Sequence, residues 1–102
     1  MASTKEYRDF ILEQLDGIEG ISCRTMMGEY ILYCGGKVFG GIYDDRLLIK
    51  SIPAALSFLP SAPWEIPYPT GRAMLLVENV DDRNFLAALI DAIRDELPPK
   101  KK

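Results

Sequence analysis

Between residues 21 and 50, four short segments of strand-forming composition follow one another with very few residues to connect them. They cover residues 21–27, 30–34, 38–43 and 46–50, and each is rich in Ile, Val, Leu, Tyr or Phe. Gly35-Gly36 and Asp44-Asp45 suit two-residue hairpin turns, because glycine and aspartate tolerate positive φ angles. Gly28-Glu29 fits a turn that has glycine at its first central position. Links this short join antiparallel neighbours, so the sequence predicts an antiparallel meander.

Tight turns also predict which side chains share a face of the sheet. Tyr33 should lie opposite Val38, Ile31 opposite Gly40, and Ile42 opposite Leu47. One face is then uniformly apolar and requires a cover of helices. Its residues are Ile31, Tyr33, Val38, Gly40, Ile42, Leu47 and Ile49.

The second face of this sheet is mixed in character but too apolar to remain bare in water. Its residues are Tyr30, Leu32, Cys34, Phe39, Gly41, Tyr43, Arg46, Leu48 and Lys50. Either another segment of the chain or a second molecule should cover it. Adjacent glycines at positions 40 and 41 are unusual within a strand, and they indicate a bulge or a close approach to the backbone.

Amphipathic segments precede and follow the meander. Ser3-Thr4-Lys5-Glu6 has the pattern of a capping box, and the apolar spacing after it predicts a helix over about residues 4 to 16. A second long helix should begin after Asp81, its predicted cap, and end at Pro98. The expected fold class is α+β, with an antiparallel meander flanked by N- and C-terminal helices.

The region between the meander and the last helix is punctuated by proline. Residues 52–59 predict a short helix with proline in its first turn. An edge strand or extended segment should follow around Trp64, and residues 73–78 should form a further strand. We expect a single domain over residues 1–102, in which residues 98–102 form a flexible tail.

Charge and hydropathy bear on the kind of partner. Asp and Glu number 15 against 12 Lys and Arg, which gives a net charge of −3. Nucleic-acid binders usually carry a basic surface, so direct nucleic-acid binding is disfavoured. The terminal Lys100, Lys101 and Lys102 are typical of a solvated end. The apolar runs are far shorter than the roughly 20 residues of a membrane span, and the N-terminus lacks a signal pattern. We therefore expect a cytoplasmic protein with no membrane partner.

Few residues offer catalytic chemistry. The absence of histidine excludes Ser-His-Asp and Cys-His arrangements as well as histidine-containing zinc sites. Cys23 and Cys34 should lie opposite each other on neighbouring strands, and we interpret them as small apolar residues rather than a redox pair. The glycines form no phosphate-binding fingerprint. We expect a protein that is not an enzyme, with no catalytic residue, metal or cofactor.

The first hairpin has an unusual composition for a strand pair. Arg24 could bind an anion or a partner carboxylate, while Met26 and Met27 would provide an adaptable contact surface. Alternatively, Arg24 could extend to the sheet edge while the methionines fill the core. The residues of the candidate partner surface are Arg24, Met26, Met27, Gly28, Tyr30 and Tyr33. Asp44 and Arg46 are secondary candidates, although paired aspartates at a hairpin tip are usually turn formers.

An ordered series of residues through the hairpins carries a family resemblance. It begins with Arg24-x-Met26-Met27-Gly28-x-Tyr30-x-x-Tyr33 and continues with Gly36-Lys37-x-Phe39-Gly40-x-Ile42-x-Asp44-Asp45-x-Leu47-x-Ile49-Lys50. This series, together with the two flanking helices, resembles the TfoX N-terminal domain family over nearly the whole chain. The family often has glycine where this chain has Glu29 and Ile31.

The resemblance implies an α+β domain with an antiparallel sheet flanked by helices. The namesakes of the family are regulators of competence development in bacteria, linked to transcription of DNA-uptake genes, and are not known as enzymes. They carry a second, C-terminal domain, whereas the sequence here stops at Lys102, so we expect a stand-alone N-terminal domain.

Three functional hypotheses follow. The first is a non-enzymatic regulatory or adaptor domain in the regulation of competence-type genes, which acts through a protein partner or as a homodimer through the second sheet face. The second is a transcriptional regulator that binds DNA directly, which requires a basic face. The third is a small-molecule-binding domain, which requires a pocket where Arg24, Asp44 and Arg46 converge.

Overall fold

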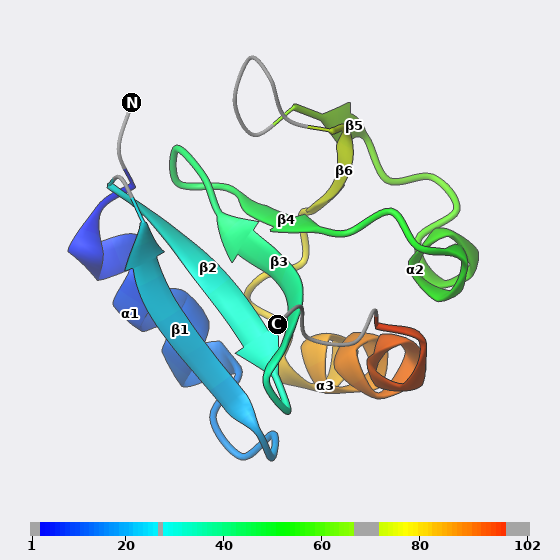
Figure 1. Cartoon of the computed structure of the whole chain (residues 1–102), viewed down its shortest axis with the longest axis horizontal. Coiled ribbons are helices and arrows are strands. Elements are labelled where there is room, and N and C mark those ends of the chain that lie inside the picture. The colour runs from blue at the N-terminus through cyan, green and yellow to red at the C-terminus, as the bar shows by residue number, and fades with distance from the viewer. Residues whose placement is uncertain (1–2, 27, 67–71, 98–102) are drawn as a thin grey trace.

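A six-stranded antiparallel sheet organises the protein in a computed structural model that describes residues 3–26, 28–66 and 72–97. Its strand order is β1-β2-β3-β4-β6-β5, so β1 and β5 form the two edges (Figure 1). The strands are β1 (Ile21–Met26), β2 (Glu29–Cys34), β3 (Lys37–Ile42), β4 (Leu47–Ile49), β5 (Trp64–Glu65) and β6 (Met74–Val77). The first four form the predicted meander, and the predicted α+β class is confirmed.

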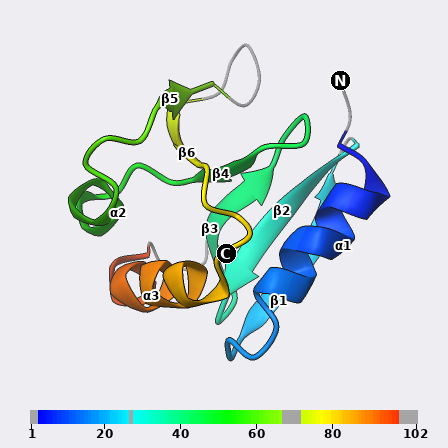
Figure 2. The ribbon, with the colours of Figure 1, turned by 180° about the vertical axis from the view of Figure 1, so that it is seen from behind.

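The two long helices lie on one face of this sheet. Helix α1 (Lys5–Gln14) precedes the meander, and α3 (Arg83–Ile93) continues into a 3₁₀ turn over Arg94–Glu96. Figure 2 shows both helices in front of the strands, whereas β1 and β2 lie in front in Figure 1. The short helix α2 (Pro53–Phe58) begins at its proline, as predicted, and packs against α3. The tail at residues 98–102 lies outside the described residues.

The core lies between these helices and the sheet. Helix α3 contributes its whole apolar face, because residues spaced three and four apart share one side of a helix. The buried residues of the helices are Ile11, Ala55, Leu86, Leu89, Ile90 and Ile93, and Leu15 at the end of α1 is buried as well. They meet strand residues from β2, β3, β4 and β6, so a single core spans most of the sheet.

Backbone geometry confirms two of the three predicted turns. Gly35 and Gly36 have φ angles of 60° and 82°. Asp44 and Asp45, at 51° and 55°, also adopt the left-handed conformation that two-residue hairpins require. The first hairpin differs from the prediction, because Met26 pairs with Glu29 and Glu29 therefore belongs to β2 rather than to the turn.

A bulge between β2 and β3 changes which side chains face the helices. Tyr33 pairs with Val38 as predicted, but Leu32 pairs with Gly40, so Phe39 is an extra residue on β3. This single insertion makes the predicted pairing of Ile31 with Gly40 wrong, since Ile31 pairs with Gly41. Because side chains alternate between the two faces of a strand, the face of β2 that is turned to the helices is the opposite of the predicted one. Its buried side chains are those of Tyr30, Leu32 and Cys34.

Both long helices begin with caps one residue later than predicted. Thr4, rather than Ser3, accepts a hydrogen bond from the Tyr7 backbone N–H. Asp82, rather than Asp81, accepts one from the Phe85 backbone N–H. The Ser3 hydroxyl donates to the Glu29 carboxylate instead, so the neighbouring threonine accepts a hydrogen bond from the first turn of the helix.

Candidate partner-binding surface

The face of β1, β2 and β3 opposite the helices is the candidate site. We call the following residues on it the outer surface: Ser22, Arg24, Met26, Ile31, Tyr33 and Val38. The register pairs Ser22 with Tyr33 and Arg24 with Ile31, so these side chains lie next to one another. Figure 1 turns this face towards the viewer, and none of the labelled helices lies in front of β1 or β2 there.

Exposure along the outer surface increases towards β1. Met26 is 53% exposed, and Arg24 and Ser22 are also exposed. Ile31, Tyr33 and Val38 are half-buried. The guanidinium of Arg24 makes no hydrogen bond or ion pair with any described residue. A free cation thus lies beside a strip of apolar side chains.

The structure brings together only some of the predicted partner-surface residues. Arg24, Met26 and Tyr33 share the outer surface. Tyr30 lies on the opposite face, where it is 7% exposed and the Arg8 guanidinium lies 5.2 Å from the centre of its ring. Gly28 belongs to the hairpin turn, with a φ angle of 84°. Met27 lies outside the described residues.

The secondary candidates lie at the β3–β4 hairpin, where they have structural partners. The Asp44 backbone N–H donates to Glu29, and the Arg46 guanidinium forms a 2.6 Å ion pair with Glu65 of β5. This ion pair joins the hairpin to the edge strand of the sheet. Arg24 lies on β1, so the three side chains do not form the pocket that the small-molecule hypothesis requires.

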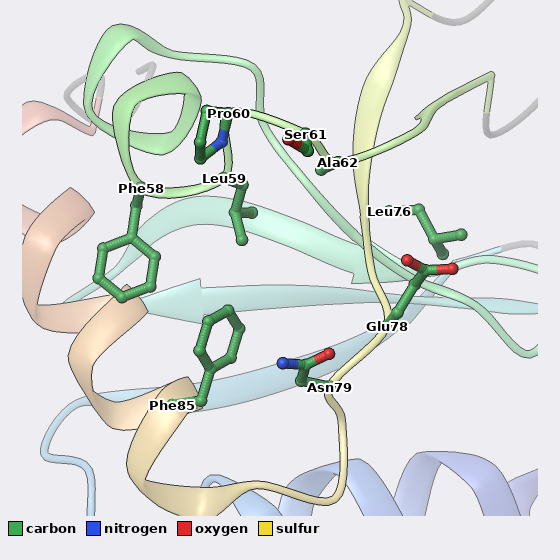
Figure 3. Close-up of a pocket in the computed structure, with 9 residues that line it drawn as sticks. All are labelled: Phe58, Leu59, Pro60, Ser61, Ala62, Leu76, Glu78, Asn79 and Phe85. Carbon is green, nitrogen blue, oxygen red and sulfur yellow. The ribbon is translucent and has the colours of Figure 1, made fainter.

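A pocket of about 300 Å³ lies elsewhere, between α2, the segment that follows it, β6 and the start of α3 (Figure 3). Its lining residues are Phe58, Leu59, Pro60, Ser61, Ala62, Leu76, Glu78, Asn79 and Phe85. The rings of Phe58 and Phe85 lie 5.4 Å apart and tilted by 53°. None of the predicted site residues that the structure describes lines this pocket. Within the described ranges, no group of three or more His, Cys, Asp or Glu side chains could hold a metal ion.

A polar cluster that was not predicted from the sequence connects Ser3 and Thr4 to two hairpins. The Glu29 carboxylate accepts hydrogen bonds from the Ser3 hydroxyl at 2.6 Å, from the Ser3 N–H at 3.0 Å and from the Asp44 N–H at 3.2 Å. The Ser3 hydroxyl oxygen in turn accepts a bond from the Asp45 N–H at 3.0 Å. The Asp45 carboxylate accepts one from the Thr4 N–H at 2.8 Å. The only sequence signal was an isolated carboxylate at the start of an apolar strand.

Removal of the Glu29 carboxylate should measure the contribution of this cluster. Glu29→Ala should lower the free energy of unfolding by about 1–3 kcal/mol, because two partly buried donors of Ser3 and the exposed Asp44 N–H lose their acceptor. Glu29→Gln keeps one carbonyl oxygen and should lose less, since bonds to a charged acceptor are stronger than bonds to a neutral one. Urea unfolding of both variants provides the comparison. Equal losses from Ala and Gln would contradict the role assigned to the hydrogen bonds.

Two groups on the helix-covered side have shifted pKa values. Burial raises the pKa of the Cys23 thiol, and the nearby Arg8 guanidinium opposes this shift. Burial also raises the pKa of the Tyr7 hydroxyl; the Asp45 carboxylate adds to the shift, while a hydrogen bond with the Leu47 backbone opposes it. Both shifts favour the neutral form of the side chain.

The prediction that the two cysteines lie opposite each other is wrong. Cys23 pairs with Leu32, and Cys34 pairs with Ile21, because the first turn is one residue earlier than expected. Both cysteines are free thiols. The Cys34 sulfur lies 3.5 Å from the Arg94 guanidinium, at the end of α3. No helix within the described part of the chain combines the length and hydropathy needed to cross a membrane.

Comparison with known proteins extends the resemblance noted in the sequence. The model of the TfoX N-terminal domain matches residues 13–96. A similar protein is an uncharacterized 12.7 kDa protein in the trpE 5′ region of Spirochaeta aurantia, 30% identical over 80 residues. That alignment covers 78% of this chain and 70% of the relative. No solved structure gives a significant match. The matched region includes all six strands and α3, and the chain belongs to the TfoX N-terminal domain family.

Proposed function

We propose that this domain is a non-enzymatic regulatory or adaptor module that binds a protein partner through the outer surface. One observation carries the proposal: the Arg24 guanidinium, which has no partner among the described residues, lies beside the exposed Met26 and the half-buried Ile31 and Tyr33, on the sheet face opposite α1 and α3. Arg, Met and Tyr are enriched in protein interfaces, and Tyr and Arg are also enriched among the residues that dominate binding energy.

The chemistry of this surface defines the partner. A carboxylate flanked by apolar side chains would pair with Arg24 and cover the strip formed by Ile31, Tyr33 and Val38. Membership of the TfoX N-terminal domain family supports a regulatory role, and we extend this to regulation of competence-type genes. The net charge of −3 favours a protein partner over duplex DNA.

The test is affinity capture of the full-length chain from native lysate, with quantitative mass spectrometry, with and without nuclease. Arg24→Glu should reduce recovery of a nuclease-resistant partner at least about tenfold, because like charges would replace an attractive pair. Arg72→Glu is the matched control, since Arg72 is exposed and lies outside the outer surface. Thermal unfolding of both variants should confirm that they fold.

Three outcomes would count against this function. Equal partner recovery with the two variants would remove the outer surface from the interface. Loss of every partner on nuclease treatment would favour DNA association instead. Recovery of only a second copy of the chain, reduced by Arg24→Glu, would assign the outer surface to self-association.

A further inference from the structure

The pocket beside α2 has walls of contrasting chemistry. In Figure 3 the rings of Phe58 and Phe85 lie on one side of it, and the Glu78 carboxylate lies on the other. The Asn79 amide lies between that carboxylate and the Phe85 ring in the same view. A ligand that spans the pocket would therefore meet aromatic rings at one end and a negative charge at the other.

The two rings form an apolar wall that a ligand can reach. Their centroids are 5.4 Å apart and the rings are tilted by 53°, an arrangement in which each ring supports the other. Both side chains are half-buried, so part of each ring remains accessible. Aromatic rings bind an apolar group through burial of its surface, and their negatively charged faces also attract a cation.

Glu78 provides the charge in the pocket. It is the only charged residue among the described residues that line the pocket, and it comes directly after β6. Its exposed carboxylate makes no hydrogen bond or ion pair with another described residue. Arg83, two residues before Phe85, donates to the Asp16 carbonyl instead. An anion in the pocket would thus be repelled by Glu78, whereas a cation would be attracted.

We propose that this pocket binds a small organic cation that consists of an apolar ring and a protonated amino group. The ring packs against Phe58 and Phe85, and the ammonium group pairs with Glu78. An ammonium group has three donors, so it can also donate to the side-chain carbonyl of Asn79. The volume of about 300 Å³ is at the lower end for small-molecule sites, which favours a single ring with a short amine over a larger ligand.

This inference goes beyond the proposed function and does not depend on it. No residue of the outer surface lines the pocket, so a bound amine leaves that surface free for a partner. The two ideas can therefore fail separately, because one is tested by capture of a protein and the other by titration of a small molecule.

Titration of the isotope-labelled full-length chain with phenylethylamine, followed by NMR, tests the site. The amine is protonated at neutral pH, because the pKa of an alkylammonium group is about 10. The backbone amide signals of Ala62, Leu76, Asn79 and Phe85 should shift and saturate, with a Kd on the order of 1 mM for a ligand of this size. Phenylethanol has the same ring without the charge and should bind at least about fivefold more weakly. Phenylpropionate, an anion, should cause no saturable shift.

Variants of the chain separate the two walls of the pocket. Glu78→Gln keeps the size of the side chain and should weaken phenylethylamine binding about threefold, because an exposed ion pair contributes modestly. It should leave phenylethanol binding unchanged. Glu13→Gln is the matched control, since Glu13 is exposed on α1 and does not line the pocket. Phe58→Leu removes a ring but keeps an apolar side chain, and should weaken both ligands. Thermal unfolding checks that each variant folds.

Three results would overturn the proposal. The first is the absence of saturable shifts at these amides at millimolar phenylethylamine. The second is equal affinity for phenylethylamine and phenylethanol, which would remove the role of Glu78. The third is equal weakening by Glu78→Gln and Glu13→Gln, which would assign binding to general attraction of a cation to a chain with a net charge of −3.

Discussion

Gly40→Ala should destabilise the fold by about 3 kcal/mol or more, a large share of the stability of a domain of this size. A Cβ atom at this position would lie 2.1 Å from the Leu48 carbonyl oxygen and 3.1 Å from the Ile49 Cα. These are backbone atoms of β4, and Gly40 pairs with Ile49 in the ladder. They can move only if β3 and β4 separate, which adds lost hydrogen bonds to the steric clash.

Urea unfolding followed by circular dichroism measures this loss. Gly17→Ala is the control, because a Cβ atom there has nothing within 4 Å and its cost is limited to the positive φ angle of 93°. That strain amounts to about 1–2 kcal/mol. A Gly40→Ala protein with the same unfolding midpoint as Gly17→Ala would show that β4 accommodates the methyl group.

Phe39→Ala should cost about 3–5 kcal/mol, the range found when a large aromatic side chain is removed from a core. Phe39 is fully buried, and it is the extra residue of the bulge between β2 and β3. The bulge turns its ring towards the core, where it packs with the buried residues of the sheet and helices. Its removal leaves a cavity that the surrounding strands, held by the ladder, can fill only in part.

Phe10→Ala makes the same chemical change at a ring that is 36% exposed. The expected loss there is below about 1.5 kcal/mol, because less apolar surface returns to water. Differential scanning calorimetry of the two variants should show the larger drop in melting temperature for position 39. Similar drops would mean that the Phe39 ring contributes no more to the core than a surface aromatic.

Local turn chemistry predicted most of the sheet. Gly35-Gly36 and Asp44-Asp45 allow few alternatives to a two-residue hairpin, so the β2–β3 and β3–β4 connections followed directly. The adjacent Gly40 and Gly41 indicate a bulge or a close backbone approach, and both occur. The position of the extra residue could not be predicted, because turn chemistry does not specify where along two strands an insertion falls. That one residue decides which face of β2 is buried.

The candidate site could be predicted in part. Strand alternation places Arg24 and Met26 on one face, and pairing across the hairpin adds Tyr33. The three-residue spacing between Tyr30 and Tyr33 already separates them to opposite faces, which excludes Tyr30 from a common surface with Tyr33. The contacts of Glu29 could not be predicted from the local sequence, since its partners Ser3 and Asp44 lie 26 and 15 residues away in the chain.

The polar cluster at the N-terminus imposes an order on folding during synthesis. Thr4 caps α1 and also donates to Asp45, which lies 41 residues later in the chain. At about 5–20 residues per second, the ribosome needs roughly 2–8 s to add that stretch. The first helix must therefore wait, with its apolar face uncovered, for strands that have not yet been made. During this time chaperones can bind the uncovered apolar face of the helix. A translational pause before residue 45 would prolong its exposure.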